Sequence, residues 1–145
     1  MMRRWAWIAL ALPLLGGCRQ PPQAGVEVSG QQIYLARCAI CHGIHGEGVL
    51  NYPALTRSQW VDGPPNRLAA IVLDGMQGRI GNYNAVMPGW GATLRDTEIA
   101  AILTWLRKQD GKSPVTAVDI NHTRIVTGNH NTFWNAEDLQ NLPDR

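Results

Sequence analysis

The sequence lacks three patterns that would place it in common structural or functional classes. No long stretch alternates apolar and polar residues, so a sheet-rich fold is not indicated. The 13 basic side chains form no cluster and are balanced by 11 acidic ones, so nothing indicates nucleic-acid binding. No segment repeats along the 145 residues, and one modest domain is therefore expected.

The sequence also has little material for a packed core. It contains a single phenylalanine, whereas 15 glycines and 9 prolines favour loops. A domain so rich in loops buries little apolar surface of its own, and a large buried ligand would help it to fold.

Cysteine is scarce. Of the three cysteines two stand close together at 38 and 41, so the third has no other cysteine with which to form a disulfide. Cys18 stands alone after a basic start, an apolar run over 5–15 and the small pair 16–17. The run is too short to cross a bilayer and is typical of a secretory signal. The string "LGGC" resembles the lipobox of bacterial lipoproteins, in which the signal is removed before a cysteine that is then lipidated. An ordinary signal with a chance cysteine is the alternative.

The lipobox implies the organisation of the N-terminus. We expect a signal peptide over 1–17 and a tether over 18–29, with lipid on Cys18. The protein is then exported and held on a bacterial membrane, most simply facing the periplasm. Removal of 1–17 leaves 11 basic and 11 acidic residues, so acyl chains rather than basic charge provide the membrane attachment.

Helical patterns dominate the remainder. In the first segment Gly30, Tyr34 and Cys38 recur on one face. Three more segments follow at 64–75, 95–111 and, more weakly, 116–126. Prolines open the first of these, Asp96 can cap the second, and Thr116 can cap the third. We expect an all-α fold with long loops at 43–63 and 76–94.

The stretch "RCAICHG" holds Cys38, Cys41 and His42 and allows several chemistries. A structural zinc site needs four ligands, and the other histidines show no paired ligand spacing. A thioredoxin-like dithiol needs a βαβ setting, which the pattern lacks, and a plain disulfide needs no histidine. Cys-x-x-Cys-His is the signature of c-type haem attachment, because both thiols reach one porphyrin edge while the imidazole turns onto the iron. Together with export and the helical pattern, this favours one covalent haem c.

At this point the chain resembles the class I c-type cytochromes over about residues 30–110. The resemblance rests on "GQQIYLARCAICHGIHGEG", "YPAL", "LAAIVLDGMQGRI", "YNAVMPGW" and "DTEIAAILTWLRKQ". It is strongest to single-haem domains of bacterial oxidase, nitrite reductase and quinoprotein dehydrogenase systems. It implies helices wrapped around one haem, with the first and last helices crossing closely at Gly30, and with Tyr34 and Trp105 holding the scaffold. Residues 111–145 form an extension, which Trp134 and Leu139 are expected to pack on the domain; a docking arm for a partner is the alternative.

The resemblance also implies the remaining site residues. Met87 in "AVMPGW" is the expected sixth ligand, opposite His42, while Met76 is expected to pack in the core. The carbonyl of Pro53 is the expected acceptor for the ring of His42. Buried haem propionates need donors, for which the candidates by loop position are Trp60, Arg79 and Tyr83.

His/Met ligation fills both axial positions and suits electron transfer to and from redox partner proteins. The predicted function is therefore single-electron transfer in a membrane-anchored respiratory or periplasmic chain, with no catalytic residues. A peroxidase-like haem enzyme or a gas sensor with a labile sixth ligand is the alternative. A thiol oxidoreductase without haem is a third possibility.

Overall fold

A computed structural model of the chain describes residues 29–80, 83–128, 130 and 132–144, and it is mainly helical there. Its elements along these residues are α1 (Gly30–Arg37), α2 (Ala39–His42), α3 (Gln59–Asp62), α4 (Pro65–Asp74), β1 (Gly75–Ile80), β2 (Tyr83–Pro88), α5 (Asp96–Gln109), α6 (Ala117–Val126) and α7 (Ala136–Asn141). The predicted helical fold class is confirmed. The predicted signal peptide, Cys18 and the predicted tether up to residue 28 lie outside the described residues, whereas the last tether residue, Ser29, is the N-cap of α1.

Helices α1 and α5 cross at close range, as the resemblance to the class I c-type cytochromes implies. Gly30 is buried at the start of α1, and a Cβ there would overlap the backbone carbonyl of Ala101 in α5. Beside this contact the rings of Tyr34 and Trp105 lie with centroids 4.6 Å apart. Glycine is therefore required at position 30, because any side chain would push the two helices apart.

Helix α4 forms much of the buried core. It begins at Pro65 with Pro64 as the N-cap, and it ends at Asp74 with Gly75 as the C-cap, whose φ of 87° is in the left-handed region. Leu68, Ile71 and Leu73 are buried along it. The expected bounds of this helix are confirmed.

The segment after α4 differs from the expected loop at 76–94. Strands β1 and β2 form an antiparallel hairpin, with Met76 opposite Met87 and Gly75 opposite Pro88. The strand signal is weak in the sequence because each strand has only six residues and glycine lies within β1. Similarly, the expected loop at 43–63 contains one short helix, α3, whose start is capped by the hydroxyl of Ser58.

The start of α5 also differs from expectation. Arg95 is the N-cap and Asp96 is already the first helical residue. The carboxylate of Asp96 instead accepts bonds from Arg124 of α6, at 2.7 Å from Nη2 and 3.1 Å from Nε. A short acidic side chain next to a helix start predicts a cap, but here a cation 28 residues away binds it.

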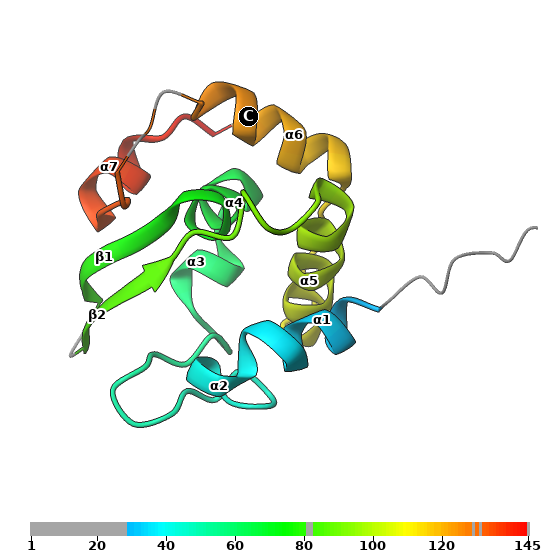
Figure 1. Cartoon of the computed structure of the whole chain (residues 1–145), viewed down its shortest axis with the longest axis vertical. Coiled ribbons are helices and arrows are strands. Elements are labelled where there is room, and N and C mark those ends of the chain that lie inside the picture. Colours follow the sequence, from blue (N-terminus) through cyan, green and yellow to red (C-terminus); the bar gives the residue numbers. More distant parts are fainter. Residues whose placement is uncertain (1–28, 81–82, 129, 131, 145) are drawn as a thin grey trace, which may run out of the picture.

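The C-terminal extension packs on the domain, as expected. Thr116 caps α6, and Ile120 of α6 and Leu139 of α7 are fully buried. Trp134, between these helices, is only 6% exposed. In Figure 1 the extension runs over the top of the molecule and returns beside β1. None of the helices in the described part of the chain is long and apolar enough to cross a membrane.

Candidate functional site

The cysteine motif lies on one tight helical turn. Helix α1 ends at Arg37, and the chain continues into α2 with bonds from His42 N–H to the Cys38 carbonyl (3.0 Å) and from Gly43 N–H to the Ala39 carbonyl (2.9 Å). Cys38 and Cys41 are both partly exposed free thiols, so they do not form a disulfide with each other. The turn therefore presents two unbonded sulfur atoms next to one imidazole.

The imidazole of His42 is buried and oriented by a backbone carbonyl. Its side chain is 8% exposed, and Nδ1 lies 3.1 Å from the carbonyl oxygen of Pro53. A carbonyl can only accept, so Nδ1 carries the proton and Nε2 keeps a free lone pair. Burial lowers the pKa of His42, although the Pro53 bond opposes this, so the ring is held in the neutral form that binds a metal.

Gly48 brings Pro53 back to His42. Its φ is 82°, and a Cβ there would press on the carbonyl of Tyr52 and the amide of Ala54. Its N–H donates to the His42 carbonyl at 2.8 Å. Only glycine tolerates both this φ and so close an approach of the backbone. The glycine six residues after His42 is therefore needed for the chain to turn back and bring Pro53 to the histidine.

The thiol and phenol near this turn are held protonated. Burial, and then the charge of Cys41, raise the pKa of the Cys38 thiol to about 11. A redox-active dithiol needs a lowered thiol pKa, so the thiol oxidoreductase alternative is disfavoured. Burial also raises the pKa of Tyr34 above its usual range, and its hydroxyl donates to the Gly43 carbonyl at 2.7 Å.

The two candidate methionines face each other across the hairpin. Residues directly opposite in an antiparallel pair point to the same side of the sheet, so Met76 and Met87 share one face. They differ in burial: Met76 is 2% exposed within the core, whereas Met87 is partly buried at its margin. A side chain at the margin of the core is accessible to a ligand beside the core, and one enclosed within it is not.

Of the propionate candidates, Trp60 has the environment that a bound acid group requires. It is 8% exposed, and no described group accepts a bond from its buried indole Nε1–H. A buried donor without a partner is costly, which indicates that a ligand supplies the acceptor. Arg79 is exposed in β1. Tyr83 begins β2, and its side chain lies outside what the structure describes.

Arg107 is a site residue that the sequence analysis missed. It is 6% exposed, and its Nη1 donates to the carbonyls of Val61 (2.6 Å) and Gly63 (2.9 Å). Its Nε donates to Ser113 at 3.0 Å. The side chain thereby fixes α3, which carries Trp60. The sequence contains a signal for this role, because Arg107 lies four residues after the buried Leu103 and therefore on the apolar face of α5. Most basic residues in a last helical turn instead lie on the exposed face.

These residues fit a covalent haem better than the competing groups. The two free thiols can form thioethers, His42 offers Nε2, and Trp60 offers an unused donor. In the described part of the chain no three His, Cys, Asp or Glu side chains gather as a metal cluster, so a structural zinc is not supported. The expected contact between His42 and Pro53 is present in the structure.

Comparison with known proteins gives a consistent result. The family described as "Cytochrome C oxidase, cbb3-type, subunit III" matches residues 27–106. The chain is 37% identical to the cbb3-type cytochrome c oxidase subunit FixP of Azorhizobium caulinodans over 93 residues, which cover 63% of this chain and 30% of FixP. It is 34% identical to cytochrome c55X of Stutzerimonas stutzeri over 82 residues, with 57% of this chain and 66% of that protein covered.

A third relative is matched over more of its length. Cytochrome c6 of Rippkaea orientalis is 33% identical over 89 residues, which cover 61% of this chain and 76% of that protein. The chain thus spans most of this small cytochrome but less than a third of FixP.

Proposed function

The chain belongs to the class I c-type cytochromes, in the family of the cbb3-type oxidase subunit III, and on this premise we propose that it is a lipid-anchored electron carrier or electron-transfer subunit. It binds one covalent haem c and transfers single electrons. The haem, when bound, supplies an iron that alternates between two oxidation states. The further proposals concern the residues, the anchor and the partners.

We assign the haem to the residues around α2 and the hairpin. Cys38 and Cys41 would form the thioethers, and His42 and Met87 would hold the iron from opposite sides. The observation that carries this assignment is the geometry of His42, whose Nδ1 lies 3.1 Å from the Pro53 carbonyl and whose Nε2 remains free beside two free thiols. Pro53 orients the imidazole and fixes which nitrogen carries the proton, whereas burial favours the neutral ring by lowering the pKa of His42.

The chain's own residues also favour electron transfer over catalysis. With His42 and Met87 both bound, no axial position is left for a substrate. Trp60 would donate its indole N–H to a propionate, and we include Arg79 and Tyr83 as further propionate contacts. Arg107 keeps α3 and Trp60 in place. A rigid pocket of this kind limits the reorganisation that accompanies each transfer.

The methionine assignment is tested by a pair of variants. Met87→Ala should abolish the Met–iron charge-transfer band, lower the reduction potential and raise peroxidase activity, because an axial position opens to water or peroxide. Met76→Leu keeps the apolar volume and should change none of these. Optical spectra and redox titration of both variants provide the measurement. If Met76→Leu loses the band while Met87→Ala keeps it, the assignment is wrong.

Capture of the open position by another side chain can mimic a retained ligand. A low-spin spectrum at a clearly lower potential in Met87→Ala would indicate capture by His45 or a lysine. The double variant Met87→Ala/His45→Gln then separates the two: high-spin iron identifies His45 as the captor.

We further propose that residues 1–17 are removed and that Cys18 is lipidated. "LLGGC" and the absence of a partner for Cys18 support this proposal. Cys18→Ser should block processing or release the protein from bacterial membranes, as followed by fractionation and mass spectrometry. Gln31→Ala, at an exposed position of α1 beyond the tether, is the control. Unchanged processing and membrane retention of Cys18→Ser would refute the lipobox.

The partners proposed here follow from the relatives. FixP is named as a subunit of a cbb3-type oxidase, which suggests that this chain serves a respiratory oxidoreductase as carrier or subunit. The donor and acceptor are then proteins of the same exported compartment. Affinity isolation from solubilised membranes would test this: co-purification of a haem-copper oxidase or a dehydrogenase is expected, and purification only as a free monomer would count against a subunit role.

A further inference from the structure

The C-terminal extension is hydrogen-bonded to the outer edge of strand β1. Trp134 N–H donates to the Gly75 carbonyl at 3.0 Å, and Gln77 N–H donates to the Trp134 carbonyl at 2.8 Å. The two bonds make a parallel bridge between Trp134 and Met76. One residue of the extension thus forms an isolated β-bridge to β1. The bridge lies on the edge of β1 opposite to the edge that pairs with β2.

The side chain of Trp134 keeps this bridge in place. It is 6% exposed, and its indole Nε1–H donates to the carboxylate of Asp74 at 3.0 Å. The ring of His130 stacks on it, with centroids 3.4 Å apart and planes inclined by 3°. Trp134 is therefore bound through its backbone, its indole N–H and its ring face.

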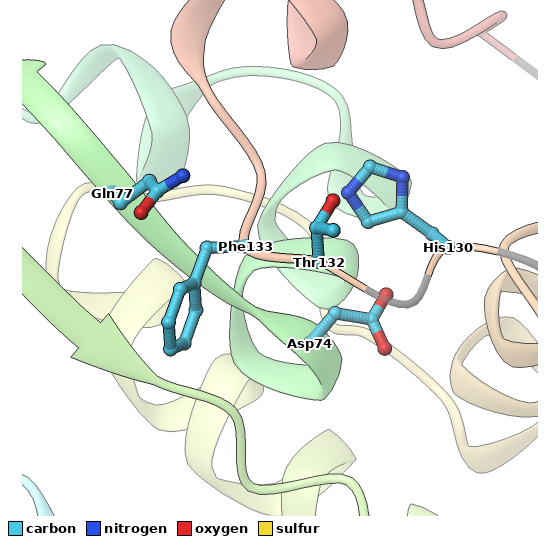
Figure 2. A pocket seen from close by; sticks show the side chains of 5 residues that line it. All are labelled: Asp74, Gln77, His130, Thr132 and Phe133. Carbon is cyan, nitrogen blue, oxygen red and sulfur yellow. The ribbon is translucent and has the colours of Figure 1, made fainter.

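The surroundings of this contact are open. A hollow of about 510 Å³ lies beside this contact. Figure 2 shows the side chains that line it, which come from α4 (Asp74), β1 (Gln77) and the extension (His130, Thr132 and Phe133). His130 Nε2 is buried without a described partner. Met76 of β1 is 2% exposed within the core, so the bonds of Trp134 add to the packing that holds the start of this strand.

The bridge acts on the strand pair that carries the proposed sixth ligand. Trp134 bonds to the residues on either side of Met76, and Met76 lies directly opposite Met87. An isolated two-stranded hairpin is only marginally stable in water, so the two backbone bonds from Trp134 to the edge of β1 make the hairpin harder to open. Opening of the hairpin would carry Met87 away from its position.

We propose that Trp134 is a positioning residue for the axial methionine: by fixing β1 it holds β2, and with it Met87, at the haem. This inference rests on the proposed function, in which Met87 is the sixth ligand. It assigns a role to the extension in addition to stability, namely control of how readily the sixth position opens to other ligands.

The test uses the full-length holoprotein and three variants. Trp134→Ala removes the ring and its bonds. Trp134→Phe keeps an aromatic ring for His130 but loses the bond to Asp74. Leu106→Ala makes a cavity in α5, which lies across the molecule from the hairpin, and serves as the control for a general loss of stability (Figure 1).

Three quantities are measured: the affinity of the oxidised protein for imidazole, the pH midpoint at which the Met–iron band is lost, and hydrogen exchange of the Gln77 amide. Trp134→Ala should bind imidazole about tenfold more tightly and lose the band about one pH unit lower, since lost local bonds raise the open population by about that factor. Trp134→Phe should give a smaller shift in the same direction. Leu106→Ala should lower the melting temperature without changing the other quantities.

The outcomes separate this inference from the proposed function. A wild-type protein without the Met–iron band, or a band retained in Met87→Ala, contradicts the ligand assignment itself. A normal band with Trp134→Ala behaving like Leu106→Ala overturns the positioning role alone. If Trp134→Ala fails to retain haem, the test rests on Trp134→Phe and Asp74→Ala, which both remove the bond between the indole N–H and the Asp74 carboxylate. Each should increase the affinity for imidazole about threefold. No change in either would overturn the proposal.

Discussion

At the scale of single residues, the site depends on two buried N–H groups, the Nδ1–H of His42 and the indole N–H of Trp60. The Pro53 carbonyl fixes which nitrogen of His42 is protonated, and the buried Trp60 N–H lacks an acceptor among the described groups. Low polarity makes a satisfied bond strong and an unsatisfied group costly. His42 and Trp60 are therefore expected to affect the electronic properties of the haem more than the stability of the fold.

Trp60→Phe should alter the pH dependence of the reduction potential. The indole N–H stabilises an ionised propionate, so its loss raises the propionate pKa. Ionisation of a propionate favours the oxidised, more positive haem and lowers the potential. The fall in potential with rising pH should therefore move to higher pH in the variant, as measured by redox titration at a series of pH values. Trp105→Phe is the control, and equal curves for wild type and Trp60→Phe would remove Trp60 from the propionate site.

Arg107→Gln should destabilise the protein by about 2–4 kcal/mol, because it leaves the carbonyls of Val61 in α3 and of Gly63 just after it without this donor. The neighbouring Lys108 is exposed, so Lys108→Gln should change the unfolding free energy little. Guanidinium unfolding of the two variants gives the comparison. Similar, small effects for both would show that Arg107 contributes only as a surface charge.

At the scale of elements, the α1–α5 crossing and the hairpin serve different purposes. The crossing is held by Gly30 and the Tyr34–Trp105 ring contact and holds the helix that leads into the cysteine motif. The hairpin carries Met87 and is attached by backbone bonds to the extension. One is a packed contact fixed by shape, and the other is a hydrogen-bonded contact that can open locally.

Gly30→Ala should cost about 3 kcal/mol, since the added methyl overlaps the Ala101 carbonyl and backbone on both sides must move. Gln31→Ala, at the exposed next position of α1, should be near neutral. Thermal unfolding of the two holoproteins measures the difference. A fully stable Gly30→Ala would mean that the helices do not approach as described.

At the scale of the whole molecule, the extension and the domain share one core. Ile120 and Leu139 are fully buried, and polar ties join Arg124 to Asp96 and Asn66 to the Pro143 carbonyl. Elements that share a core unfold together. The complete chain should therefore unfold in a single cooperative step.

A chain that ends at Gly111 should be less stable yet keep a low-spin spectrum at neutral pH. His122 is exposed on α6 and His130 stacks on Trp134, so neither is expected to bind iron. Loss of Trp134 should also make imidazole binding tighter. Spectra and unfolding curves of the two chain lengths test this. High-spin iron at neutral pH in the shorter chain would show that the extension supplies a ligand or is needed to retain one.

The sequence by itself determined the local arrangement of the cysteine motif and the helices near it. Cys38, Cys41 and His42 lie within one helical turn, so their arrangement follows from local geometry once the turn forms. The same applies to the prolines and Gly75 that bound α4, and to the cap at Thr116. These signals are local, because each acts through the backbone within four residues.

Only the tertiary structure decided which distant groups meet. The hairpin, the pairing of Asp96 with Arg124, the bonds of Arg107 to α3 and the bridge from Trp134 to β1 were not predicted. Each joins groups that a residue pattern treats separately, and most use backbone atoms that are the same in every residue type. Such contacts form only when packing of the apolar core brings the strands and helices to their places, because that burial provides the free energy that aligns them.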